Sequence, residues 1–388
     1  MVAVTSGTGS RAGPDAGPDV PSDQEPAGGA PPRSRTTLAR APGGAVVLRS
    51  RRLGASLRVD ARSVAVTLVA LAAASAVFAW SLTLGDFPLP LADVVASLVG
   101  GGDEGTDFIV HTLRLPRGLV GLLVGGAFGL SGAIFQRLAR NPLASPDIIG
   151  VNAGAAASAV LVIVVLHGSS AQVTWGALAG ATGTATATYV LSYKRGVTGY
   201  RLVLVGIGAT AMLTSATSYL MTRAEIYDAQ RAMVWLTGSL DGRGWDHVRP
   251  LVFALATLVP VALLLARHLR TLDMGDDAAA GLGTRVEPVR SGLLLTGVAL
   301  AAVAVASAGP ITFVALVSPQ IARRLVGGGS AALLPSAALG ALLLVASDLI
   351  ARRIFAPTEL PVGIATAVLG APYLLALLAR ANRIGSAG

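Results

Sequence analysis

Long apolar runs recur along this chain, and short polar connections separate them. A helix that crosses a bilayer needs roughly 20 mostly apolar residues, and runs of this kind follow one another between residues 63 and 380. Charged residues make up only 13% of the chain, and its mean hydropathy is +0.66. Soluble globular proteins carry about a quarter charged residues, so this chain cannot cover a surface that faces water. The sequence predicts an all-α polytopic membrane protein.

The apolar runs divide into about ten predicted transmembrane helices. The eighth is short and lies between Pro310 and Pro319, so we expect a broken or half-inserted helix there. Irregular backbone at membrane depth is tolerated only where protein or a cavity shelters it. The ten predicted segments are 63–83, 115–137, 148–167, 172–192, 201–222, 248–267, 290–308, 311–326, 333–354 and 362–380.

The two ends of the chain differ in composition from the apolar region, 63–380, that we predict to be the transmembrane domain. Residues 1–62 begin rich in Gly, Pro, Ala and Ser and end in a run of arginines. We predict a disordered, basic cytoplasmic arm over 1–62, with its arginines against anionic lipid headgroups, and a short cytoplasmic tail over 381–388. The first apolar run starts too deep in the chain and is too long for a cleaved signal peptide.

Arginines are unevenly distributed among the predicted loops. If the N-terminus is cytoplasmic, most arginine-bearing loops lie on the cytoplasmic side, as the positive-inside rule requires, and ten spans return the C-terminus to that side. Arg114, Arg117, Arg352 and Arg353 are among the arginines that instead fall near the outer surface. Arginines at such positions can anchor a helix by extending to the headgroups.

The sequence contains little that is typical of an enzyme active site. The chain has no cysteine, and its four histidines are scattered without the spacing of a metal site. Lys194 does not follow the glycine-rich loop of an ATP-binding motif, so any ATP hydrolysis must come from a separate subunit. Few acidic residues lie in the predicted spans, with Asp348 the clearest case, which weakens the hypothesis of a proton-coupled carrier.

Four consecutive motifs form the most specific feature of the chain. They are L-R-L-P-R at 113–117, S-G-A-I-F-Q at 131–136, R-N-P-L-A-S-P at 140–146 and G-V-N-A-G-A at 150–155. In this order they resemble the signature of the FecCD family, the permease subunits of ABC importers for iron–siderophore complexes, haem and cobalamin. The resemblance covers about residues 65 to 380 and implies the ABC importer permease fold, with inverted repeats.

The resemblance also implies an assembly and a cargo. A second permease subunit, identical or different, would pair with this one, and two separate ABC ATPase subunits would use ATP. An extracytoplasmic substrate-binding lipoprotein would deliver a ferric siderophore for alternating-access transport across the cytoplasmic membrane of a bacterium. No cofactor, metal or nucleic acid would bind this subunit. Cobalamin or haem is the alternative cargo, and an ion-coupled secondary transporter is the alternative outside this class.

Three groups of site residues follow from the family motifs. Docking of the binding protein is implied at Arg114, Arg117 and Arg352, because a guanidinium group binds a carboxylate bidentately. A cytoplasmic gate is implied at Asn141, Leu143, Thr198, Gly199 and Tyr200. The segment 272–283 resembles the family's coupling loop, two short helices that seat in a groove of the ATPase, which implies coupling by Leu272, Gly275, Asp276, Ala279, Leu282 and Gly283.

The segment 307–324 resembles the family pattern G-P-I-G-F-V-G-L-V-x-P-H-I-A-R with changes. The main one is Gln320, which stands where the family usually has histidine. Glutamine can keep a hydrogen bond but cannot titrate, so any role of that histidine's proton does not apply here. Arg353 matches no family motif and is expected to be a headgroup anchor.

Overall fold

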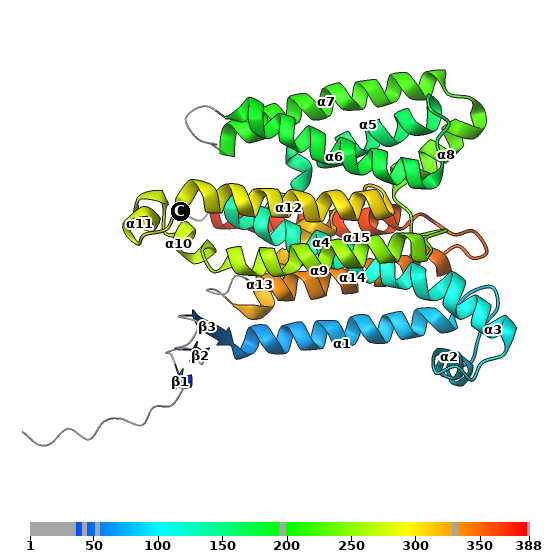
Figure 1. The fold of residues 1–388 in the computed structure, drawn as a ribbon, viewed down its shortest axis with the longest axis horizontal. Coiled ribbons are helices and arrows are strands. Elements are labelled where there is room, and N and C mark those ends of the chain that lie inside the picture. Colours follow the sequence, from blue (N-terminus) through cyan, green and yellow to red (C-terminus); the bar gives the residue numbers. More distant parts are fainter. Residues whose placement is uncertain (1–35, 41–44, 51–54, 194–198, 328–331, 386–388) are drawn as a thin grey trace, which may run out of the picture.

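The computed structural model describes residues 36–40, 45–50, 55–193, 199–327 and 332–385, and most of them are helical (Figure 1). Each of the ten predicted spans overlaps a helix. Among the described residues, six helical runs are long and apolar enough to cross a membrane by length and composition. The ten helices are α1 (Ala61–Thr83), α4 (Leu115–Leu138), α5 (Val151–Val164), α6 (Ser170–Ser192), α7 (Gly199–Arg223), α9 (Trp245–Ala266), α12 (Val286–Ala308), α13 (Val314–Val326), α14 (Leu333–Arg353) and α15 (Val362–Gly385).

Helix α4 lies at the centre of the bundle, packed against α9, α12, α13 and α14 (Figure 1). Small residues make this packing close. A Cβ atom added to Gly129 would overlap the carbonyl oxygen of Ser336 on α14, and one added to Gly132 would overlap that of Ala315 on α13. Helices in lipid gain little from the hydrophobic effect and instead associate through such close approach. The glycines of α4 therefore set the distance between the central helices.

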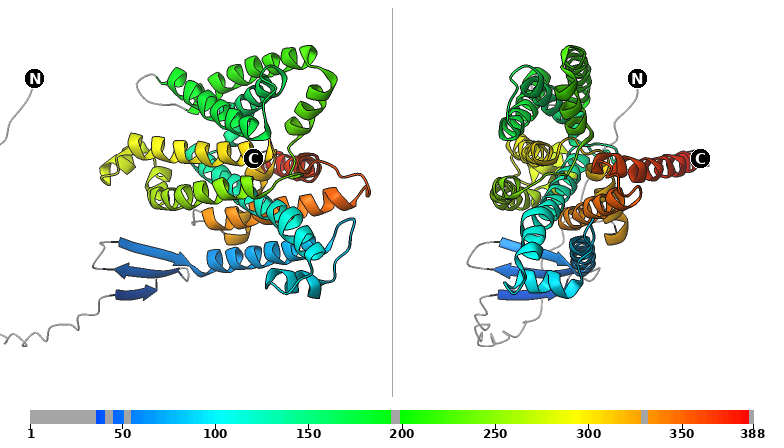
Figure 2. Two further views of the ribbon diagram at one scale, coloured as in Figure 1. Left: turned by 45° about the vertical axis from the view of Figure 1, so that its right-hand side comes forward. Right: turned by 90° about the vertical axis from the view of Figure 1, so that its right-hand side faces the viewer.

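A second group of helices packs against one side of this centre. Helices α5, α6 and α7, with the short α8 (Ile226–Thr237), lie together beyond α12 in all three views (Figures 1 and 2). Helix α7 has only a small part of its apolar surface buried. Its composition suits a lipid or protein neighbour better than water.

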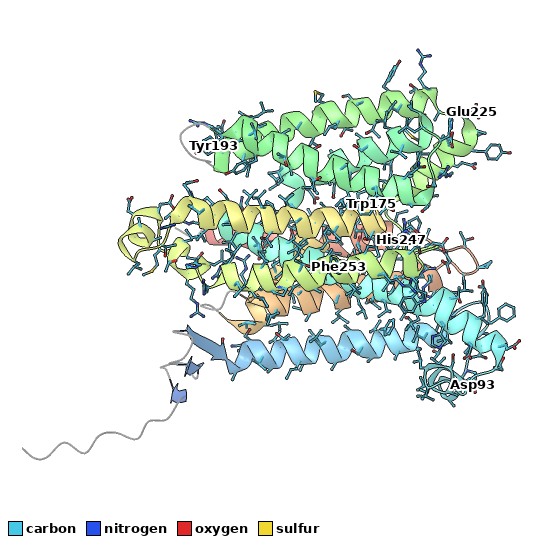
Figure 3. The ribbon with its side chains drawn as sticks, viewed as in Figure 1. Asp93, Trp175, Tyr193, Glu225, His247 and Phe253 are labelled. Carbon is cyan, nitrogen blue, oxygen red and sulfur yellow. The ribbon has the colours of Figure 1, made fainter. Side chains whose placement is uncertain are left out.

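The short elements gather at the two ends of the bundle. At one end, the α2 end, lie α2 (Leu91–Leu98), α3 (Glu104–Phe108), the π-helical turn η1 (Ile109–Arg114) and α8. At the other, the α10 end, lie α10 (Leu269–Asp273), α11 (Asp276–Gly281) and the turn that connects α4 to α5. Figure 3 shows the same division, with Asp93 and Glu225 at the α2 end and Tyr193 at the α10 end.

The basic arm is not wholly without structure, which differs from the prediction over 1–62. A three-stranded antiparallel sheet at the α10 end contains β1 (Thr36–Arg40), β2 (Ala45–Ser50) and β3 (Ala55–Asp60), with Leu48 opposite both Leu38 and Leu57. The strand β3 alternates apolar and polar residues, the period-two pattern of a strand, which an argument from overall composition overlooks. Residues 1–35 lie outside the described residues.

The chain is irregular at two of the predicted span boundaries. The expected break before α13 is confirmed: the backbone is non-helical from Gly309 to Phe313, both of which have positive φ values, 79° and 69°. Helix α15 continues to Gly385, past the predicted boundary at 380, so part of the expected tail is helical.

Candidate functional site

Five charged residues form a cluster at the α2 end. The Arg117 guanidinium donates to Asp348 at 3.0 Å and to Glu359 at 2.8 Å, and it lies 3.5 Å from Asp241. Arg352, one helical turn after Asp348 on α14, pairs with the same carboxylate at 3.1 Å. We call these residues the α2-end charge cluster: Arg117, Asp241, Asp348, Arg352 and Glu359.

The cluster is buried on one side and open on the other. The side chains of Arg117, Asp348 and Arg352 are 13%, 5% and 11% exposed. Glu359 and Asp241 are 45% and 75% exposed. The two arginines therefore share one buried carboxylate, while the remaining carboxylates face the surface.

The other arginine of the L-R-L-P-R motif is bound differently. Arg114 donates to the backbone carbonyl of Leu82 at 2.7 Å and to that of Phe87, and so holds the connection between α1 and α2. The three arginines predicted to dock the binding protein thus lie at one end, and each already binds acceptors of this chain. Their docking role stays a prediction. Within the part of the chain that the structure describes, Arg353 is exposed and has no ion pair.

The acidic partners of these arginines were not predicted. Asp348 and Arg352 are four residues apart on one helix, a spacing at which opposite charges meet, so this pair could have been found from the sequence. Asp241 and Glu359 lie in connections far from Arg117 in the sequence, and no local pattern indicates that they meet it.

At the α10 end, the predicted gate begins where α4 ends. The side chain of Asn141 accepts a hydrogen bond from the Leu143 amide at 2.9 Å, and the carbonyl of Asn141 accepts one from Ala144 at 3.1 Å. These bonds close a tight turn, as expected for asparagine before proline. Both Asn141 and Leu143 are exposed. We call residues 141–146 the gate turn.

A large cavity, of about 770 Å³, lies beside the gate turn. Asn141 and Tyr200, two predicted gate residues, line it together with Asp276 of the predicted coupling loop and with Arg290. Leu143 is not among its lining residues, Gly199 is the first residue of α7, and Thr198 lies outside the described residues. Part of the predicted gate and part of the predicted coupling loop therefore line the same cavity.

Two short helices are present as expected: α11 lies within the predicted coupling loop, 272–283, and α10 begins at Leu269, before it. They are separated at Gly275, which has a φ of 107°, and end before Gly283, which has a φ of 80°. Leu272 and Ala279 are buried and hold the helices to the bundle, while the side chains of Leu282 and Asp276 are exposed. Leu282 therefore faces outward, Asp276 pairs with Arg290, and the role of this loop in coupling stays a prediction.

Gln320 holds the gate turn to α13. Its amide donates to the carbonyl of Pro142 and, at 3.1 Å, to the side-chain oxygen of Gln136, which also accepts from Arg323 at 3.0 Å. The Gln136 amide in turn donates to Leu316 at 2.9 Å. Glutamine thus supplies at this position a structural hydrogen bond that needs no titratable group.

Close to the gate turn, Asp147 lies in a short 3-10 helix, Pro146–Ile149. Burial raises the pKa of its carboxyl to about 6, and a hydrogen bond from Ser145 opposes this shift. Its carboxyl therefore gains or loses its charge near pH 6, where an aspartate with an ordinary pKa is fully ionised.

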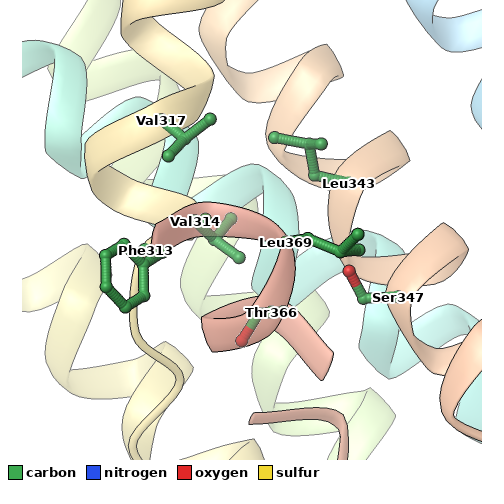
Figure 4. Close-up of a pocket in the computed structure, with 8 residues that line it drawn as sticks. Phe313, Val314, Val317, Leu343, Ser347, Thr366 and Leu369 are labelled. Carbon is green, nitrogen blue, oxygen red and sulfur yellow. The ribbon is translucent and has the colours of Figure 1, made fainter. Parts of the chain in front are cut away.

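A second cavity lies between α13, α14 and α15. Figure 4 shows apolar side chains around it, with Ser347 and Thr366 as its polar groups. Its volume, about 40 Å³, suits a few water molecules and is far below the roughly 300 Å³ at which ligand pockets begin. Among the described residues, no three His, Asp or Glu side chains are grouped as a metal site.

The described residues thus form a tightly packed bundle of apolar helices with two short helices at one end, as a membrane transporter can have. In agreement, a solved structure of a metal-chelate type ABC transporter, in an inward-facing conformation, superimposes with a TM-score of 0.73 at 27% identity. The match covers 81% of this chain and 99% of that one. The chain belongs to the FecCD transport family, whose model matches residues 71–380. The resemblance drawn from the motifs is confirmed.

Two relatives show how close the similarity is. The ferric enterobactin transport system permease protein FepG of Escherichia coli is 42% identical over 305 residues, which are 78% of this chain and 92% of the relative. The iron(3+)-hydroxamate import system permease protein FhuG of Bacillus subtilis is 39% identical over 315 residues, 79% of this chain and 94% of the relative.

Proposed function

We propose that this chain is the permease subunit that moves a ferric siderophore across the cytoplasmic membrane, driven by ATP hydrolysis in separate subunits. The observation that carries the proposal is the similarity to relatives named for ferric enterobactin and iron(3+)-hydroxamate, each matched over more than nine tenths of its length. The chain itself supplies the spans and a loop suited to contact an ATPase. A second permease subunit, two ATPase subunits and a substrate-binding lipoprotein complete the assembly.

The test is uptake of radiolabelled iron, supplied as ferric enterobactin or as a ferric hydroxamate, in strains with and without this gene. Labelled cobalamin is supplied in parallel. The proposal expects loss of iron uptake alone, and expects that uptake stops when ATP is depleted but continues when the proton gradient is collapsed. Loss of cobalamin uptake alone would identify cobalamin as the cargo instead. Uptake that depends on the proton gradient alone would indicate a secondary transporter.

We place the α10 end and both termini in the cytoplasm. Support comes from the arginines at this end, among them Arg137, Arg140 and Arg290, because cytoplasmic loops carry an excess of positive charge. The chain has no cysteine, so single cysteines can be labelled without background. A membrane-impermeant maleimide should label Phe87→Cys in spheroplasts and leave Ala278→Cys unlabelled until the membrane is opened. The reverse labelling pattern would show that the protein has the opposite orientation.

We also assign docking of the binding lipoprotein to the α2 end. Arg114, Arg117 and Arg352 lie there, and the exposed Glu359 and Asp241 are carboxylates that an incoming acidic side chain would replace on Arg117. The measurement is the Kd of the substrate-loaded lipoprotein for the purified transporter. Arg114→Gln and Arg117→Gln should each weaken it, with Arg353→Gln, at the same end, as the matched control. Weakening by the control alone would contradict the assignment.

A further inference from the structure

Two arginines at the end of α4 bind the α10–α11 segment. Arg137, in the last turn of α4, pairs with Asp273 at 2.8 Å. Arg140, two residues past the helix, donates to the Leu272 carbonyl at 2.6 Å. Hydrogen bonds with a charged donor are about twice as strong as neutral ones. The predicted coupling loop is therefore attached to α4 at two separate points.

A third contact continues this attachment to α12. Asp276, the first residue of α11, lies 3.8 Å from Arg140 and 2.6 Å from Arg290 of α12. Arg290 also pairs with Glu287 of α12 at 3.3 Å. Through Asp276, α11 therefore contacts both Arg140, just past α4, and the start of α12. A displacement of α11 would therefore change the contacts of Asp276 on both sides.

Arg140, whose side chain contacts α10, also precedes the gate turn directly in the chain. Its φ is 49°, in the left-handed region that residues other than glycine seldom adopt. In this conformation the chain leaves α4 and enters the gate turn at Asn141, while the Arg140 side chain reaches α10. One residue therefore contributes both to the direction of the gate turn and to the position of α10.

The gate turn is held on its other side as well. Gln320 of α13 donates to the carbonyl of Pro142 in the middle of the turn. The turn thus lies between a contact to α13 and, one residue before it, a contact to α10. The cavity of about 770 Å³ is lined by both the turn and Asp276, so a joint movement of α11 and the turn relative to the other lining helices would change the shape of that cavity.

We propose that Arg137 and Arg140 are positioning residues that transmit movement of the α10–α11 segment to the gate turn within one subunit. The proposal rests on the proposed function, in which the ATPase moves this segment. Arg137 acts by keeping Asp273, and with it α10, fixed to α4. Arg140 acts by joining α10 to the start of the gate turn.

A charge-reversal experiment tests the Arg137 contact. The variants are Arg137→Asp, Asp273→Arg and the two combined, with Arg285→Asp as matched control, because Arg285 is exposed at the same end and has no ion pair within the described residues. Siderophore uptake, ATP hydrolysis and recovery of the ATPase with the purified permease are measured together. Each single variant should lower uptake about tenfold, the scale of a typical coupling between sites, while hydrolysis and ATPase recovery persist. The combined variant should restore most of the uptake.

Unchanged uptake in the single variants would overturn the proposal, as would failure of the combined variant to restore it. Loss of ATPase recovery in a single variant would also overturn it, because the contact would then serve docking of the ATPase. Failure of the wild-type protein to carry any siderophore would instead contradict the proposed function, and a second readout is needed for that case.

The second readout follows the segment itself. Since the chain has no cysteine, spin labels can be placed on Ala280→Cys in α11 and Ser145→Cys in the gate turn of the complete transporter. The distance between them should be narrowly distributed with and without ATP, and Arg140→Ala should broaden the distribution. An unchanged distribution in Arg140→Ala would overturn the proposal whatever the cargo is.

Discussion

The buried carboxylate of Asp348 offers the sharpest test of the α2-end charge cluster. Asp348→Asn keeps the shape of the side chain and removes the charge that Arg117 and Arg352 share at 3.0 and 3.1 Å. Removing one partner of a buried ion pair costs about 3–5 kcal/mol, because the other charge is left buried and unpaired. Arg117 retains Glu359 at 2.8 Å, so we expect the lower end of this range, a loss of about 3 kcal/mol in the free energy of unfolding.

The assay is equilibrium unfolding by SDS in mixed micelles, followed by tryptophan fluorescence. The matched control is Asp241→Asn, which removes a carboxylate of the same cluster that is 75% exposed and lies 3.5 Å from Arg117. Exposed ion pairs contribute about 0–1 kcal/mol, so the control should lose at most about 1 kcal/mol. Equal losses in the two variants would refute the reasoning, because burial would then not decide the energy of these pairs.

Three further predictions concern stability. The pKa of Asp147 is raised to about 6, so on acidification the folded state takes up a proton before the unfolded state does. The free energy of unfolding should therefore rise by about 1 kcal/mol from pH 7 to pH 5, and Asp147→Asn should remove this rise in unfolding titrations at the two pH values. Gly132→Ala should destabilise the fold by about 1–3 kcal/mol because its Cβ meets the α13 backbone, and Gly126→Ala, whose Cβ has room at 3.7 Å, should be nearly neutral; equal unfolding midpoints would contradict this. Gln320→Leu should cost about 1–3 kcal/mol by leaving a carbonyl of the gate turn without its donor, and Gln320→His should recover part of that loss in the same assay.

The helices could be predicted from the sequence because membrane spans need only length and apolar composition. Their ends were harder to predict. Residues 148–150 were placed in a span, but Ile149 ends a 3-10 turn and Gly150 has a φ of 81°, so α5 begins only at Val151. Conformations of this kind depend on tertiary contacts, which apolar periodicity does not report.

The site could be predicted as residue types and places, but not as contacts. Motif similarity indicated Arg117 and Asn141 as functional residues, and the structure places them at opposite ends of α4. That Arg117 binds Glu359, or that Arg140 binds Leu272, depends on the rotation and register of helices distant in sequence. Residue spacing within one segment carries no information about these quantities.

The packing of α4 has a mechanical consequence. A helix of 24 residues is about 36 Å long, and one with as many glycines as α4 would bend readily if it stood alone. In this bundle Gly125 and Gly129 lie directly against the backbone of α14, and Gly132 lies against that of α13, which restricts bending of this part of the helix. We therefore expect α4, which has an arginine near each end, to move as one unit. We expect that a displacement at the Arg137 end reaches the Arg117 end as a tilt or slide of the whole helix together with its neighbours.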